Sequence, residues 1–165
     1  MEISQFFVWL HETSFATTIR ENSFLFPWIE SVHVLALTLM VGSIAIVDLR
    51  LLGIASVNRS VASLSGEVLP FTWTAFIFAV LTGSALFASH AVGYAQNLQF
   101  RMKMLLLVLA GINMLVFHLI LGRGIGRWSE SGVTPWQGKG AGLISLLLWV
   151  GIVAFGRWIG FATIP

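Results

Sequence analysis

The sequence predicts an all-α integral membrane protein, an up-down-up-down four-helix bundle preceded by a short interfacial helix. Of the 165 residues, 57% are hydrophobic and only 10% are charged, against roughly 25% charged residues in an ordinary soluble domain. The apolar residues also gather into four stretches that are each near the ~20 residues needed to cross a bilayer. Because so few charged side chains cannot cover so apolar a body, a soluble fold is excluded.

The first element is expected to lie on the membrane rather than to cross it. Residues 4–20 place apolar side chains near helical spacing after Ser4, which is a candidate helix cap, but Glu12 and Arg20 make the segment too polar to span. An acidic start and the lack of a small-residue cleavage site predict that the segment is not a removed signal peptide.

Four membrane spans are expected after it, in a single domain over residues 1–165. Several tryptophans fall near the expected ends, where an aromatic belt meets the membrane–water interface. All three connections are short enough to join antiparallel neighbours, which favours the up-down-up-down order. The expected spans are about residues 25–50, 69–91, 99–122 and 140–162.

Basic residues in the connections predict the orientation. Short loops that are rich in Lys and Arg stay on the cytoplasmic side of a membrane. Here such loops follow the first and the third span, so both chain ends are expected on the periplasmic side of a bacterial inner membrane. The basic residues of these loops are Arg50, Arg59, Arg123, Arg127 and Lys139.

The composition excludes several function classes. The chain has no cysteine, so disulfides, iron–sulfur clusters, thiolate zinc sites and covalently attached haem c are excluded. The formal net charge is only +2 and no basic stripe is present, which excludes nucleic-acid binding.

Ionisable residues from all four spans are expected in one outer-leaflet layer. An ionisable side chain inside a membrane costs about 2.5 to 3.5 kcal/mol, so each one suggests a function. A rise of about 1.5 Å per residue brings these residues to a similar depth. The layer consists of Glu30, His33, His90, Lys103 and Arg157, with Arg101 beside Lys103.

This outer layer is typical of a haem b site. His33 and His90 can supply both axial nitrogens of a haem iron, and the cations Arg101, Lys103 and Arg157 can pair with its propionates. Glu30 precedes His33 by three residues and can orient an imidazole N–H. For the cations, the alternative is that they reach to lipid headgroups.

A second polar layer is expected near the inner face. Asp48 and His118 come from antiparallel spans at similar depth, and we expect them to approach each other with Arg50 and Asn113 close by. Such a cluster can serve quinone protonation, but locking of the helices is the favoured account. His11 on the interfacial helix is either a further candidate ligand or, as we favour, a structural residue.

Four segments carry a resemblance to a known family: Pro27 to Leu35, Asp48 to Gly53, Phe100 to Lys103 and Asn113 to His118. They resemble an uncharacterised family of small bacterial inner-membrane proteins. Its plan is similar to four-helix b-type cytochromes and to the membrane domain of copper-resistance D proteins. Only three histidines lie within the expected spans, whereas diheme cytochromes place four in two opposed pairs. The resemblance implies that the family pattern includes Glu30, His33, Asp48, Arg50, Lys103 and His118.

We therefore expect a membrane b-type cytochrome that carries electrons between a membrane carrier, such as a quinone, and a redox partner at the outer face. Two alternatives stay open. One is a cofactor-free accessory or anchor subunit of a larger membrane complex. The other is a copper-transport component that uses His33, His90 and Met40. A homo-oligomer is compatible with each of these hypotheses.

Overall fold

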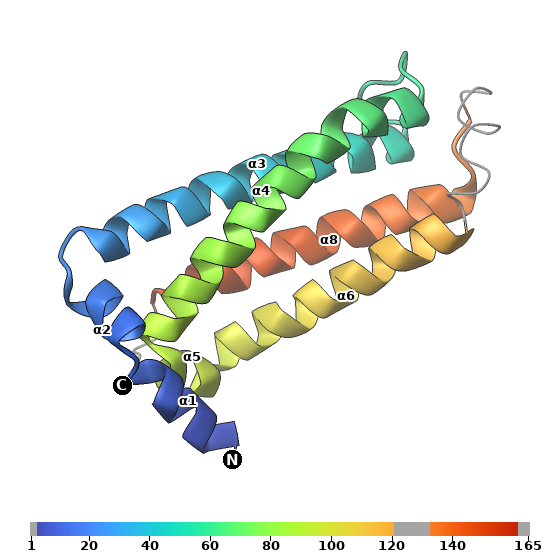
Figure 1. The fold of residues 1–165 in the computed structure, drawn as a ribbon. Coiled ribbons are helices and arrows are strands. Elements are labelled where there is room, and N and C mark those ends of the chain that lie inside the picture. The colour runs from blue at the N-terminus through green and yellow to red at the C-terminus, as the bar shows by residue number, and fades with distance from the viewer. Residues whose placement is uncertain (1–2, 121–132, 162–165) are drawn as a thin grey trace.

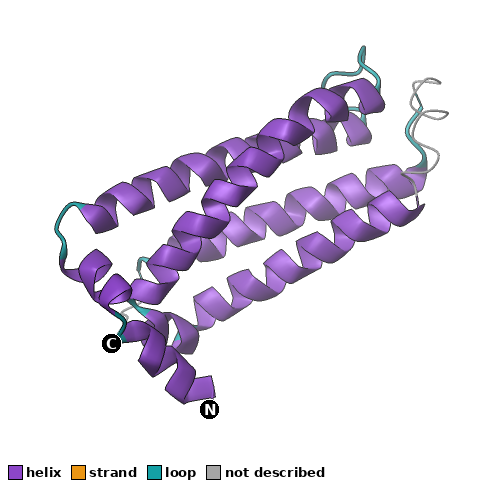
Figure 2. Ribbon diagram, in the orientation of Figure 1, coloured by secondary structure: helices purple, strands orange, loops and turns teal. Residues whose placement is uncertain are grey.

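The structure, a computed structural model, describes residues 3–120 and 133–161. Within these ranges the chain is all-α, with seven helices and no strand (Figure 2). Four of the helices are long and apolar enough to cross a membrane, which confirms the number of candidate spans. They are α3 (Leu25–Leu52), α4 (Val61–Ser89), α6 (Leu98–Ile120) and α8 (Trp136–Ile159).

The long helices are apolar on all sides. Only Ala110 of α6 is buried, while large side chains such as Val108 and Leu119 are each 59% exposed. A helix that is hydrophobic all round belongs either in a large protein core or in a membrane. The outer surface of these four helices is therefore suited to contact with lipid.

The second candidate span begins earlier than the sequence analysis expects. Its start was expected near residue 69, but α4 begins at Val61 because the Ser60 side chain accepts a hydrogen bond from Ser63 N at 3.1 Å. The first turns are polar, and Glu67 there forms an ion pair with Arg59. Hydropathy therefore detects the apolar part of the helix and misses its capped start.

The interfacial segment is two helices rather than one. Residues 3–11 form α1 (Ile3–His11) and residues 14–21 form α2 (Ser14–Glu21). Thr13 separates them: its hydroxyl donates to Leu10 O at 2.8 Å and accepts from Ala16 N at 3.3 Å. The expectation of one helix over 4–20 is wrong because a side-chain cap begins a new helix within an otherwise helical pattern.

The long helices pack as two pairs that meet at one seam. Helix α3 packs on α4, α6 packs on α8, and the pairs join where α3 packs on α8. Among the described residues, no Cα atom of α4 lies within 8 Å of α6, and none of α3 lies within 8 Å of α6. Figure 1 shows α4 and α6 apart along most of their length.

The short helices gather at one end of the long ones. Helices α1 and α2, together with α5 (Ala91–Gln96), pack on one another and on α3, α4 and α6 at one end of the molecule (Figure 1). Arg20 holds this end together, since its Nη1 donates to Ser89 O at 3.0 Å and to His11 O at 3.3 Å. We call it the α1–α2 end. The connection between α3 and α4 lies at the opposite end, here called the 53–60 end.

Candidate functional site

His33 lies between two of the candidate spans. It extends from α3, half-buried, and its Nδ1 is 2.9 Å from Thr82 Oγ1 on α4. The next residue, Gly83, makes room for the ring, because a Cβ at that position would lie 2.9 Å from His33 Cε1. The fold thus holds the imidazole in one place at the α3–α4 contact.

The hydrogen bonds at Thr82 favour one tautomer of His33. A threonine hydroxyl has one proton, and Thr82 donates it to Phe78 O at 2.6 Å. Thr82 Oγ1 therefore accepts from His33 Nδ1, which leaves a lone pair on His33 Nε2. Metal-ligating histidines typically donate their second ring N–H to an oxygen in this way.

Lys103 brings a positive charge to the level of His33 from the other helix pair. It extends from α6 toward Gly156 of α8, whose Cβ position would lie 3.7 Å from Lys103 Cδ and 3.8 Å from Lys103 Nζ. Its charge acts on the His33 ring. In the described ranges no carboxylate oxygen lies within 4 Å of Lys103 Nζ, so the ammonium is suited to an anionic ligand group.

His90 belongs to a different cluster, at the α1–α2 end. It directly follows α4, and its ring centroid lies 5.9 Å from that of Phe26, 6.2 Å from that of Tyr94 and 6.5 Å from that of His11. These neighbours come from three further helices, so His90 is a centre of packing at this end.

The proton of His90 can be placed by the same argument as that of His33. Ser89 donates its hydroxyl proton to Leu86 O at 2.7 Å, and its Oγ lies 3.0 Å from His90 Nδ1. This arrangement favours the tautomer in which His90 Nδ1 is the donor and Nε2 has the lone pair. Burial lowers the pKa of His90, and the charges of Arg20 and His11 lower it further. His90 is thus kept neutral, as a metal ligand requires.

The two predicted haem ligands lie at different levels. His33 contacts α4 at Thr82 and Gly83, and His90 comes seven residues after Gly83, roughly 10 Å farther along at 1.5 Å per residue. Among the described residues, the two imidazoles contact other side chains and not each other. That they share one iron stays a prediction.

The remaining members of the outer layer are dispersed. Glu30 is exposed and acts on Tyr94: burial raises the pKa of Tyr94 and the charge of Glu30 raises it further. Arg101 is exposed. Arg157 is also exposed, and its guanidinium carbon lies 5.2 Å from the ring centroid of Phe161. Helix ends with such exposed cations agree with the alternative that they reach to lipid headgroups.

The inner cluster does not form as expected. Asp48 is buried at the α3–α8 seam with the Ser145 hydroxyl as its partner. His118 is exposed, and its Nδ1 bonds to Met114 O of its own helix at 2.9 Å. The expected approach of Asp48 and His118 is wrong because equal depth does not determine the direction in which each side chain points.

Asn113 and Arg50 hold parts of the chain together. Asn113 Nδ2 donates to Ala141 O at 3.1 Å and so links α6 to α8. Arg50 is only 3% exposed, and its Nε donates to Arg59 O at 2.6 Å in the connection that follows α3. Both contacts are of the helix-locking kind that the sequence analysis favours for this layer.

Two hydroxyl residues escaped the sequence analysis. Thr82 and Ser89 position the two histidines, but a serine or threonine in a helix ordinarily bonds only to its own helix. The available signal was that Ser89 directly precedes His90 and that Thr82 directly precedes Gly83.

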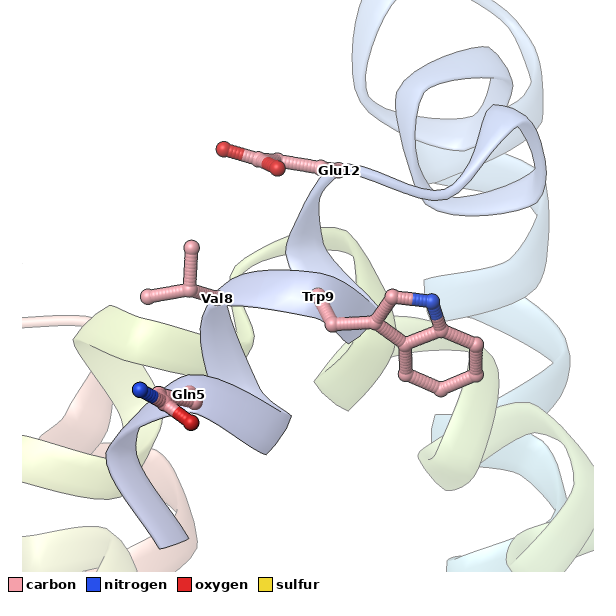
Figure 3. A pocket seen from close by; sticks show the side chains of 4 residues that line it. All are labelled: Gln5, Val8, Trp9 and Glu12. Carbon is pink, nitrogen blue, oxygen red and sulfur yellow. The ribbon is translucent and has the colours of Figure 1, made fainter. Parts of the chain in front are cut away.

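Two hollows lie away from these histidines. One is an apolar groove of about 550 Å³ between α3 and α8, with Arg157 at one end. The other is a hollow of about 350 Å³ beside α1, lined by Gln5, Val8, Trp9 and Glu12 (Figure 3). Since this second hollow is lined from α1 and the residue after it alone, it does not enclose a ligand.

Comparison with known proteins places the chain in a family. A family model, described as a family of unknown function and named DUF6644, matches residues 6–162. The chain belongs to this family. No curated protein and no solved structure matches it. For this DUF6644 protein, the similarity to four-helix b-type cytochromes and to copper-resistance D proteins therefore stays a prediction. The described residues hold no group of three His, Asp or Glu side chains suited to a metal ion, and Met40 is buried.

Proposed function

We propose that this DUF6644 protein is a multi-pass b-type cytochrome of the bacterial inner membrane that transfers electrons between a quinone and a partner at the outer face. His33 is the axial haem ligand within the helices, and Lys103 is the partner of a propionate. The observation that supports the proposal best is the hydrogen-bond chain from His33 through Thr82 to Phe78 O, which leaves the lone pair on Nε2.

The residues around His33 suit a haem group. Haem b needs a neutral imidazole on its iron and cations near its propionates, and it supplies one-electron transfer when bound. His33 extends from the α3–α4 pair and Lys103 from the α6–α8 pair. A ligand held by both therefore lies between the pairs, on the side where α4 and α6 do not pack on each other.

His90 is the second axial ligand in this proposal. Its Nδ1 is anchored by Ser89 and its pKa is lowered, so it is neutral with the lone pair on Nε2. His90 lies about two helical turns from the level at which His33 contacts α4. Replacing His33 and replacing His90 are therefore expected to affect haem binding differently. Loss of His33 would remove the ligand inside the helices, whereas loss of His90 would remove the ligand at the α1–α2 end and leave His33 to hold the haem.

Visible spectroscopy tests the proposal. The protein is expressed with ample haem, purified in detergent, and measured as reduced and oxidised samples. We expect a Soret band and a low-spin spectrum for the wild type, loss of haem in His33→Ala, and a high-spin spectrum in His90→Ala. His118→Ala is the matched control, because its imidazole is exposed and bonds only to its own helix. A wild-type protein without a Soret band refutes the cytochrome.

One set of contacts favours a second candidate, a cofactor-free anchor subunit of a larger complex. Asn113 and Arg50 use their polar groups to hold backbone carbonyls, as expected for helix locking. Under this alternative His33 is likewise a structural residue bonded to Thr82. A colourless protein that co-purifies with further subunits from native membranes supports this candidate and refutes the first.

We further propose that the four spans alternate in direction and that both chain ends lie on the periplasmic side. The start of α3 and the end of α8 lie together at the α1–α2 end (Figure 1), while Arg50, Arg59 and Lys139 lie toward the other. Because the sequence has no cysteine, single cysteines can report the side. We expect a membrane-impermeant maleimide to label Asn22→Cys and not Ser56→Cys in cells with a permeabilised outer membrane, and the reverse result refutes the orientation.

A further inference from the structure

Asp48 is a buried acid at the seam that joins the two helix pairs. It is 6% exposed, and α8 approaches it closely: a Cβ at Gly142 would lie 3.1 Å from Asp48 O and 3.2 Å from Leu51 Cβ. Helices this close leave the carboxyl little access to water. Leu52, the last residue of α3, comes four positions after Asp48, roughly 6 Å farther along the helix.

The Asp48 carboxyl has one hydrogen-bond partner for its two oxygens. The Ser145 hydroxyl of α8 bonds to it, whereas Asp48 Oδ2 is buried with no hydrogen-bond partner among the residues that the structure describes. A carboxylate can accept about four hydrogen bonds. The environment of Asp48 is therefore far from what a carboxylate ion requires.

No described cation compensates a charge on Asp48. On α3 itself, Arg50 bonds to the Arg59 carbonyl. Toward α4, Arg59 forms its ion pair with Glu67. On α8, Lys139 is exposed, and no basic nitrogen of the described residues lies within 4 Å of Asp48.

We propose that Asp48 is a proton-binding site that is a neutral carboxylic acid in the folded protein. A buried ion with neither a counter-charge nor full hydrogen bonding is far more costly than the same group with a proton on it. The proton sits on Oδ2 and exchanges with water at the 53–60 end, the nearer end of α3. This inference does not depend on haem binding, because it concerns different residues at a different level of the helices.

Infrared difference spectroscopy of the full chain in lipid vesicles tests the site. The spectrum of wild type minus Asp48→Asn at neutral pH is expected to contain the C=O stretch of a protonated carboxyl. That band is expected to shift when the vesicles are transferred to D₂O, as an exchangeable proton requires. Glu67→Gln is the matched control: its carboxyl is exposed and ion-paired with Arg59, so its difference spectrum is expected to contain carboxylate bands instead.

A second variant keeps the test valid should Asp48→Asn not fold. Ser145→Ala removes the partner hydroxyl while keeping Asp48, and the protonated C=O band is expected to move to higher frequency as that hydrogen bond is lost. Carboxylate bands for Asp48 at neutral pH overturn the proposal. A C=O band that does not shift after a day in D₂O also overturns it, because the proton is then not exchangeable.

Discussion

Replacing Gly83 by alanine is expected to displace His33. The new Cβ would lie 2.9 Å from His33 Cε1, closer than such atoms pack. The ring is not a free end that can simply turn away, because its Nδ1 is bonded to Thr82 Oγ1 at 2.9 Å. Either the imidazole leaves Thr82, or α3 and α4 move apart at this level.

The size of the effect follows from three contributions. Overpacking of a well-packed contact costs about 1–3 kcal/mol, and loss of the His33–Thr82 hydrogen bond costs about 0.5–1.5 kcal/mol. Alanine in a helix interior recovers about 0.5–1 kcal/mol relative to glycine. We therefore expect Gly83→Ala to lower the free energy of unfolding by about 0.5–4 kcal/mol.

The control is Gly66→Ala on the same helix. A Cβ there meets nothing within 4 Å, so this variant reports the helix-propensity gain alone. Reversible unfolding in mixed detergent micelles measures both variants, and haem content under the conditions of the spectroscopic test reports the position of His33. If the two variants unfold within about 0.5 kcal/mol of each other, where surface changes fall, the packing argument is refuted.

Three further predictions follow from the same contacts. Gly142→Ala places a Cβ 3.1 Å from the α3 backbone and is expected to destabilise the protein by about 1–3 kcal/mol in unfolding assays. Gly140→Ala, with open space around it, is expected to show only the helix-propensity gain of about 0.5–1 kcal/mol. Asn113→Ala loses its bond to the α8 backbone and is expected to cost about 1 kcal/mol in the same assay, with His118→Ala as the exposed control on α6. The pKa of His90 is lowered in the folded protein, so the unfolded state binds a proton more readily. The α1–α2 end is therefore expected to be stable at neutral pH and to lose stability as the pH falls below about 6.5. Limited proteolysis of α1 and α2 as a function of pH measures this loss.

The four candidate spans could be predicted from the sequence because hydropathy over about 20 residues is a direct physical requirement of the bilayer. The direction in which a side chain points could not. In a soluble helix the apolar stripe reveals the buried face, but these helices are apolar all round and reveal none. Asp48 and His118 illustrate the result: a similar depth was expected for both and suggested contact, yet Asp48 points to α8 and His118 is exposed.

The candidate site could be predicted only in its residue types. The sequence indicated that His33 and Lys103 share a level, and the electrostatic effect of Lys103 on His33 agrees with this. The contact between His90 and His11 could not be predicted in this way. It depends on the position of α1, and that position depends on the break that Thr13 makes in the interfacial segment. A cap formed by one hydroxyl thus determines the neighbours of a histidine 77 positions away.

Three polar residues of the long helices lie opposite glycines of a neighbouring helix. His33 lies against Gly83, Lys103 against Gly156, and the backbone of Asp48 against Gly142. Glycine allows helices to approach closely in a membrane, where no hydrophobic effect drives them together, and it leaves room for one larger side chain from the partner. The three contacts join α3 to α4, α6 to α8, and α3 to α8, which are the helix contacts on which the fold depends. A ligand held by His33 and Lys103 bridges the two pairs, so its binding is expected to stabilise their common seam through mass action.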